Sequence, residues 1–357
     1  MPRRTPLRSK AARPEFRAPR ARPGPVPPRA ARRKARPLPA GPFHVPISTI
    51  DWLVSRESPA ARYVALRDLL GRPAKDPEMK RARQALPRDP WTRDVLDVLR
   101  RRTLPGATMA GLSRRYDGGL WLALFLGETG CDASLPPVRH AGQVLFAAWE
   151  KAFVELSRHA DAAVDLPTFT ALCRALALMG HAEDSRLAVA ADYVARAALL
   201  GRGKTAKALL LFATLPEERR SPVVRRAVDF LRARALEAEI PREGAGGAAP
   251  EFLRAGFPNG EETDLVELLY ALALTTSEGT VDPREGALAR GLSLLLARAD
   301  HRGRWLLERA PAGGLPFPLE RTGEMSRWVT VRALLAVQRF LGLTIDSARA
   351  VPGSDRL

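Results

Sequence analysis

The amino-acid sequence predicts an all-α protein folded as a ring of helical hairpins. Six stretches repeat one plan, in which an amphipathic helix, a short polar turn and a second amphipathic helix follow one another. Apolar residues in these stretches recur at the helical spacing i, i+3, i+4 and i+7. The connections between the pairs vary in length. Since such helix pairs cannot bury their apolar faces alone, they must pack on one another.

Three leading helices show this spacing most clearly. Their apolar stripes are Phe169, Leu172, Cys173 and Leu176; Ala208, Leu211, Phe212 and Leu215; and Leu265, Leu268, Leu269 and Leu272. The trailing helices repeat the stripe with Leu187, Ala190, Ala191 and Val194; Val224, Ala227, Val228 and Leu231; and Leu288, Gly291, Leu292 and Leu295. The leading helices start 39 and then 57 residues apart. This irregularity favours a closed ring over an open superhelix, whose repeat length is nearly constant.

The chain is expected to fold as one helical domain between two disordered tails. No linker interrupts residues 43–345, which we assign to the domain, whereas residues 346–357 form a C-terminal tail. The stretch 239–262 is rich in Gly and Pro and predicts a long loop. Residues 1–42 are expected to be disordered, because a segment with ten prolines in its first 40 residues and few large apolar side chains cannot offset the entropy of ordering.

The net charge of +18 is chiefly a property of the N-terminal tail. Residues 1–40 contain 13 Lys and Arg against Glu15, whereas residues 41–357 contain 44 basic and 38 acidic residues. An arm of this kind predicts a non-specific anionic partner, either nucleic acid or a membrane surface. Phe16 is its one aromatic residue, so base stacking would contribute little. A solvated extension, or upstream sequence included by a misplaced start, is the alternative.

The two cysteines and the hydropathy indicate a cytoplasmic setting. No secretory signal precedes the first helix, and no apolar run reaches the length that spans a bilayer. Cys173 lies on an apolar stripe and is expected in the core.

Familiar catalytic and metal-binding motifs are missing from the sequence. The five histidines lack the spacing of zinc sites, so neither a metal nor a cofactor is predicted. His140 with His159, or His181 beside Glu183 and Asp184, would act as a general base only if the fold brought them to a pocket. Gly201–Thr205 imitates the end of a phosphate-binding loop, but Ala198 stands where that loop needs glycine. We interpret Gly201 as the end of one helix, shortly before the next begins.

Three segments, Ser58–Gly71, Tyr116–Gly130 and Glu324–Leu341, resemble those of bacterial squalene-cyclase-like proteins. These proteins belong to the superfamily of terpenoid cyclase and prenyltransferase α/α toroids. The resemblance covers about residues 48–345 and implies inner helices enclosed by outer helices, with a central cavity open at one end. Gly303-Arg304-Trp305 is similar to the Gly-x-Trp turn that clasps neighbouring helices in such rings.

The chain departs from this family's catalytic patterns. The Asp-x-Asp-Asp motif that protonates an alkene is missing, and Cys131 stands beside Asp132 rather than at the spacing of a prenyltransferase zinc site. The resemblance therefore implies a toroid without recognisable catalytic motifs.

The cavity of such a ring is the expected ligand site. Candidate lining residues are Tyr116, Asp117, Trp121, Glu324, Arg327 and Trp328. Arg327 and Arg332 flank Trp328 and could hold an anionic head group such as a diphosphate. For the tryptophans, simple core packing is the alternative.

Three hypotheses for function follow. The first is a non-enzymatic toroid that holds an apolar or isoprenoid ligand or a protein partner. The second is an active terpenoid cyclase or prenyl-transferring enzyme that uses an unrecognised acid such as Asp117 or Glu324. The third is a helical scaffold that binds nucleic acid or an anionic membrane through residues 1–40. The sequence carries no signal for an oligomeric state.

Overall fold

The computed structural model describes residues 36–114, 118–158, 165–240, 251–277, 279, 281–311, 315 and 319–346. The chain divides into two units, Met1–Arg32 and Arg33–Leu357, and the first lies outside the described residues. The predictions for most of the two tails therefore fall outside them too. In the second unit the described residues are mostly helical, which confirms the all-α class.

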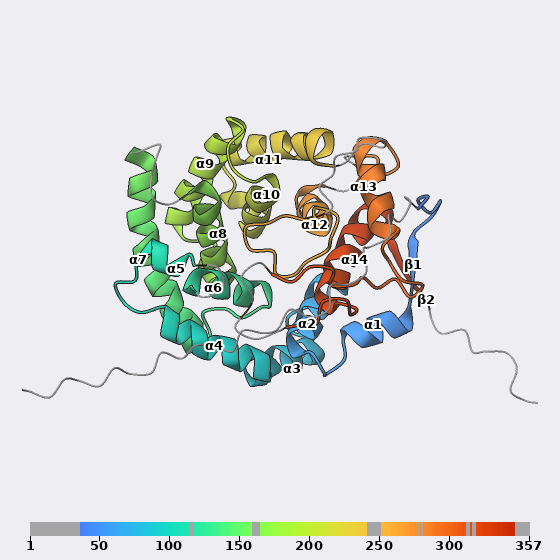
Figure 1. Ribbon diagram of the computed structural model, residues 1–357, viewed down its shortest axis with the longest axis horizontal. Coiled ribbons are helices and arrows are strands. Elements are labelled where there is room, and N and C mark those ends of the chain that lie inside the picture. The colour runs from blue at the N-terminus through green and yellow to red at the C-terminus, as the bar shows by residue number, and fades with distance from the viewer. Residues whose placement is uncertain are drawn as a thin grey trace, which may run out of the picture. The chain divides into compact units, whose positions relative to one another are not determined.

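An inner layer of helices forms a ring (Figure 1). Its members are α2 (Pro59–Val64) with its π-helical continuation η1 (Ala65–Leu69), α6 (Gly119–Glu128), α8 (Leu166–Leu176), α10 (Thr205–Thr214), α12 (Leu265–Thr275) and α14 (Arg327–Leu341). Helix α6 packs against α8, α8 against α10, α10 against α12, and α12 against α14, which in turn contacts α2 and η1. The packing thus runs from α6 around to α2.

The ring closes where the chain leaves α6 and meets α2. Gly130 has a φ of +91°, in the left-handed region that favours glycine. A Cβ atom at this position would lie 2.3 Å from Cε1 of Tyr63 in α2. The backbone after α6 therefore lies directly on the Tyr63 ring, and a larger residue would force the two helices apart.

An outer layer of helices links consecutive inner ones. It comprises α1 (Ile47–Leu53), α3 (Pro77–Ala85), α4 (Pro90–Arg102), α5 (Met109–Leu112), α7 (Pro136–Arg158), α9 (Ser185–Leu199), α11 (Pro222–Arg234) and α13 (Gly286–Leu296). Short helical turns extend the connections: η2 (Leu86–Arg88), η3 (Ala177–His181), η4 (Glu217–Arg219) and η5 (Ala235–Glu239). Helix α7 packs on α8, α9 and α11 pack on α10, and α13 packs on α12.

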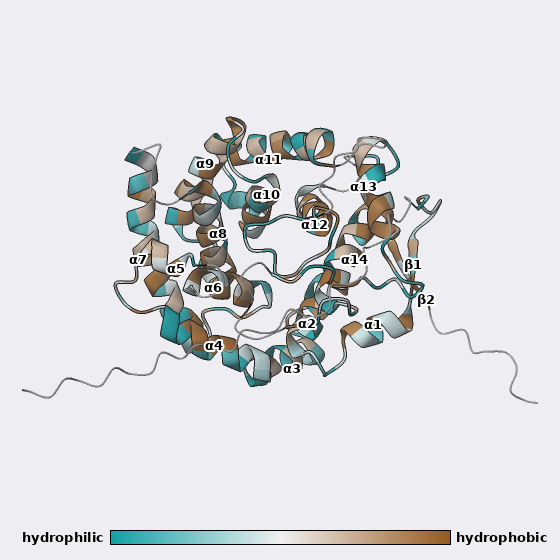
Figure 2. Ribbon diagram, in the orientation of Figure 1, coloured by the Kyte–Doolittle hydropathy of each residue, from teal (hydrophilic) through white to brown (hydrophobic). Residues whose placement is uncertain are grey.

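Burial explains why the sequence separates into these two layers. Helix α6 buries nine of its ten residues and α12 eight of its eleven, whereas α4 buries four of thirteen. An inner helix is covered on both sides and is therefore apolar all round, while an outer helix keeps one polar face. Figure 2 shows the contrast, with α12 mostly brown and α3 carrying teal. The predicted leading helices are α8, α10 and α12, and the trailing ones are α9, α11 and α13.

Polar caps set the helix starts. The side chains of Asp89 and Asp165 accept hydrogen bonds from backbone N–H groups three residues on, and a proline occupies the first or second helical position. The sequence interpretation of Gly201 is confirmed, because its φ of +75° follows the end of α9 and Thr205 begins α10.

A small parallel sheet departs from the purely helical prediction. Strand β1 (Phe43–Pro46) pairs with β2 (Leu343–Asp346), so the two ends of the domain lie side by side. Each strand has four residues, too few to show an alternating pattern in the sequence. Near them, Trp305 donates from Nε1 to the Leu295 carbonyl, and its backbone N–H donates to Oγ1 of Thr330. Trp305 thereby joins α13 to α14.

Part of the predicted long loop folds back into the ring. Phe257 is buried, and its ring stacks on Trp328 of α14 with centroids 4.8 Å apart. Asn259 of the same stretch is also buried, as is Asp264 just after it, so residues 251–264 help to fill the interior.

Two further findings concern membranes and cysteines. In the described part of the chain, no helix is both long and apolar enough to cross a membrane. Cys131 and Cys173 are free and buried, and burial raises the pKa of each thiol to about 12. The prediction that Cys173 belongs to the core is confirmed.

The substitution Gly130→Ala tests the ring closure. Gly180 offers a matched control, since its φ is +104° and its missing Cβ would meet nothing within 4 Å. We expect Gly180→Ala to lower the free energy of unfolding by about 1–2 kcal/mol through backbone strain alone. Gly130→Ala should cost roughly 1–3 kcal/mol more, because it adds the collision with Tyr63. Urea unfolding measures both, and equal losses would contradict the close contact between α6 and α2.

Candidate functional site

Five charged side chains meet in the interior of the ring. Each comes from a different inner helix, and none has more than 10% of its side chain exposed. They are Glu128 of α6, Arg174 of α8, Lys207 of α10, Glu267 of α12 and Arg332 of α14. We call them the interior cluster. Because charged groups are rarely buried unless paired, the position of each needs an electrostatic explanation.

Arg332 connects the two carboxylates of the interior cluster. Glu128 accepts a 2.6 Å hydrogen bond from Arg174 through Oε1, and its Oε2 lies 3.0 Å from Nη2 of Arg332. Glu267 accepts a 2.6 Å hydrogen bond from Lys207 through Oε2, and its Oε1 lies 3.7 Å from Nη1 of Arg332. The charges thus form one continuous network across five helices.

Burial and charge oppose each other in the pKa values of this network. Burial alone would raise the pKa of Glu128, but the charges of Arg332, Arg174 and Lys207 outweigh it and lower that pKa. Burial lowers the pKa of Lys207, although its contact with Glu267 opposes this. Glu128 is therefore ionised at neutral pH and has no proton to donate.

The interior cluster has an excess of positive charge and of hydrogen-bond donors. Three cations face two carboxylates. Nε of Arg174, Nη1 of Arg332 and Nε1 of Trp328 are buried and have no hydrogen-bond partner among the described residues. The 3.7 Å from Arg332 Nη1 to Glu267 is too long for a hydrogen bond. An unsatisfied buried donor costs about 1–3 kcal/mol, so an acceptor placed here would be bound favourably.

Aromatic rings lie beside these donors. Trp328 stacks on Phe257 at an interplanar angle of 10°, and the Arg332 guanidinium lies 4.5 Å from the centroid of the Phe257 ring. The centroid of the Phe125 ring lies 5.4 Å from that of the Phe257 ring. The site therefore combines cationic donors with an adjoining apolar surface.

The residues predicted to line the cavity are separated by the structure. Trp328 lies in the interior beside Arg332. Trp121 is buried, but its Nε1 donates to the Ser113 carbonyl at 2.7 Å, within its own hairpin. Glu324 is 63% exposed. Tyr116 and Asp117 lie outside the described residues.

Arg327 faces away from the interior cluster. Its Nη2 lies 2.7 Å from Glu57, and its guanidinium lies 5.0 Å from the centroid of the Trp52 ring. These contacts hold the start of α14 to α1 and the loop after it. Arg327 and Arg332 therefore contact different parts of the protein and do not lie around one common head-group site.

Sequence analysis missed four members of the interior cluster: Glu128, Arg174, Lys207 and Glu267. A signal was present, since each is an isolated charge within a strongly apolar stretch, such as LFLGE or FTALCRALAL. An isolated charge on a helix that is apolar all round must be buried with a partner.

Two other buried carboxyl groups lie near the ends of inner helices. Asp264 caps α12, where its oxygens accept from the N–H groups of Gly256 and Glu267 and from Nδ2 of Asn259. Burial raises the pKa of Asp264 despite these donors. Burial also raises the pKa of Glu320, which accepts from the N–H of Arg327 through Oε1 and has no partner at Oε2 among the described residues.

The described histidines do not assemble into a catalytic or metal site. Nε2 of His140 lies 3.0 Å from the Thr103 carbonyl, and His181 meets the Phe146 ring edge to face. Within the described ranges, no three His, Cys, Asp or Glu side chains group as metal ligands. His159 lies outside those ranges.

Comparison with protein-family models, curated proteins and solved structures finds no match for this chain. The resemblance to squalene-cyclase-like proteins therefore stays a prediction.

The substitution Glu128→Gln tests the interior cluster. At pH 7 it should lower the free energy of unfolding by about 3–5 kcal/mol, because Arg174 and Arg332 lose a buried counter-charge. The pKa of Glu128 is lower in the folded than in the unfolded protein. Its contribution is therefore present above the ordinary glutamate pKa of about 4.5 and is lost as the pH falls through the folded value. The difference in the free energy of unfolding between wild type and variant should therefore shrink as the pH falls below the folded-state pKa of Glu128.

Glu150→Gln is the matched control. Glu150 is 61% exposed and lies 3.0 Å from Arg186, so its loss should cost less than about 1 kcal/mol. Denaturant unfolding across a pH series measures both variants. A similar cost for the two would show that Glu128 is not held in a buried network.

Proposed function

We propose that this protein is a non-catalytic ring that binds, in its interior, a ligand with an anionic head and an apolar body. The observation that carries the proposal is a set of three buried donors on Arg174, Arg332 and Trp328 that have no partner among the described residues, beside a cluster with one excess positive charge. A single anionic group would neutralise that charge and accept from those donors.

The chemistry of the head group follows from the donors. Guanidinium groups bind phosphate and carboxylate oxygens through charge-assisted hydrogen bonds, which are roughly twice as strong as neutral ones. The body of the ligand would contact Phe125, Phe257 and the Trp328 ring, which adjoin the donors. An isoprenoid diphosphate, of the class that the resemblance implies, combines both features.

The state of the carboxylates supports binding over catalysis. Starting a cyclisation requires a protonated acid, yet Glu128 accepts from Arg174 and Glu267 accepts from Lys207. Asp264 has a raised pKa, but its two oxygens already accept three hydrogen bonds.

A cytoplasmic location, inferred from two free cysteines, is part of this proposal.

A second candidate function has one observation in its favour. Glu320 is a buried carboxyl group with a raised pKa and an unpartnered oxygen among the described residues, as a general acid would need. Turnover of a prenyl diphosphate or of squalene that Glu320→Gln abolishes would favour this enzymatic alternative.

Titration of the full chain with farnesyl diphosphate and with uncharged farnesol tests the binding proposal. By calorimetry, the diphosphate should bind at least about tenfold more tightly, because only it can pair with the excess charge. Trp328→Phe removes one donor and keeps an aromatic ring, so it should weaken diphosphate binding roughly fivefold to thirtyfold and leave farnesol binding nearly unchanged.

The control is Trp149→Phe. Trp149 is also buried, but it belongs to the outer helix α7 and stacks on Phe153. This variant should bind both ligands as the wild type does. Equal affinity for the two ligands, or equal effects of the two tryptophan variants, would refute an anion site in the interior.

A further inference from the structure

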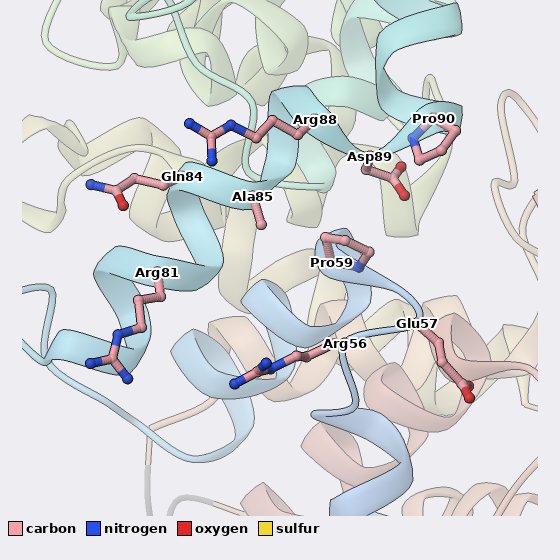
Figure 3. Close-up of a pocket in the computed structure, with 9 residues that line it drawn as sticks. All are labelled: Arg56, Glu57, Pro59, Arg81, Gln84, Ala85, Arg88, Asp89 and Pro90. Carbon is pink, nitrogen blue, oxygen red and sulfur yellow. The ribbon is translucent and has the colours of Figure 1, made fainter.

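A second, separate cationic site lies on the outer surface of the ring. A groove of about 420 Å³ runs between the loop after α1 and the segment from α3 through η2 to the start of α4 (Figure 3). Its lining residues are Arg56, Glu57, Pro59, Arg81, Gln84, Ala85, Arg88, Asp89 and Pro90. The volume falls within the range typical of ligand sites.

The arginines of this groove have no counter-charge. Arg56, Arg81 and Arg88 are exposed, and none has an ion-pair partner within the described part of the chain. Figure 3 shows these three side chains extending to the same side, while Glu57 points the other way.

The two acidic lining residues are engaged elsewhere. Glu57 lies 2.7 Å from Arg327, and Asp89 caps α4 by accepting from the N–H of Thr92 at 2.9 Å. Arg327 neutralises Glu57, whereas Asp89 keeps its negative charge, so the three arginines outweigh one uncompensated carboxylate in the groove.

The groove lies in a basic part of the helical domain. Residues 72–102, which form α3, η2 and α4, contain ten Lys and Arg against five Asp and Glu. The net charge of this segment, +5, is nearly the whole excess of +6 carried by residues 41–357. This positive charge lies on the edge of the ring where α3 and α4 follow one another (Figure 1).

We propose that this groove and the basic face of α3 and α4 bind the phosphate backbone of a nucleic acid, independently of base sequence. Guanidinium groups pair well with phosphates, and a regular row of phosphates matches several arginines along one groove. Trp91, which follows Pro90 of the groove, packs edge to face on Phe125 with centroids 4.5 Å apart. It therefore offers no stacking platform for bases.

The surface suits a nucleic acid better than a membrane. The site is concave, and none of its lining residues is a large exposed apolar side chain. A membrane-binding face normally inserts apolar side chains between lipid head groups. The proposal is independent of the interior ligand, because none of the groove residues belongs to the interior cluster.

Binding of a labelled DNA duplex to the full chain tests this proposal. The triple variant R56Q/R81Q/R88Q should bind at least about tenfold more weakly near 0.1 M salt, in fluorescence anisotropy. The slope of log affinity against log salt should fall in magnitude by about 2 to 3, since each lost phosphate contact removes about 0.9. A duplex of unrelated sequence should give the same result.

R202Q/R225Q/R226Q is the matched control. It removes the same charge from exposed arginines before α10 and on α11, on the opposite edge of the ring from α3 and α4 (Figure 1). This variant should bind DNA within about threefold of the wild type. Equal losses in the two triple variants would show that only total charge matters and would overturn the proposal.

Two other outcomes would also overturn the proposal. One is unchanged DNA binding in the groove variant, which would assign the binding to other parts of the chain such as residues 1–40. The other is loss of binding to phosphatidylserine vesicles with DNA binding unaffected, which would make the groove a membrane site. Thermal unfolding by circular dichroism checks that both variants fold, as expected for exposed side chains.

Discussion

The ring depends on Arg332, which lies between two buried carboxylates. Removing one partner from a buried ion pair strongly lowers the stability of the fold, whereas the apolar contacts around it tolerate small shifts. The inner helices are rich in Leu and Ala on all sides, so apolar packing alone would permit several rotations of each helix. One charge per helix, satisfied only when Glu128, Glu267 and Arg332 meet, selects a single arrangement. We regard this specificity, more than added stability, as the structural role of the interior cluster.

Local periodicity was enough to predict the hairpins but not how the ring is completed. The stripes of α8 to α13 repeat every 3.6 residues, and that information is contained within each helix. The pairing of β1 with β2, the contact of Gly130 with Tyr63 and the bridge from Glu128 to Arg332 join residues that are distant in the sequence. None of these contacts leaves a periodic pattern, so they became visible only in three dimensions.

Only part of the candidate site could be predicted, because residues that are adjacent in sequence point in different directions on a helix. Successive residues turn by about 100°, so Arg327 and Trp328 point in different directions, while Trp328 and Arg332 share one face. From the sequence, this helix and the residues Arg327, Trp328 and Arg332 could be singled out, but not which of the two arginines faces the interior. Glu324 precedes the helix in an exposed turn, where carboxylates are well solvated.

The two cationic sites differ in the environment of their charges, and this difference separates their functions. The interior cluster is nearly desolvated, so salt ions screen it little and its affinity depends on fit and on the number of hydrogen bonds. The arginines of the groove are in water, where charges more than about 10 Å apart are largely screened at 0.1 M salt. Their contribution comes from several weak contacts acting together, as a polymer of phosphates would provide. A single small anion would satisfy the interior but could engage only part of the basic face, because residues 72–102 spread their charge over two helices. In the two proposals the same side chain, arginine, would thus recognise one head group inside the ring and a charged backbone outside it.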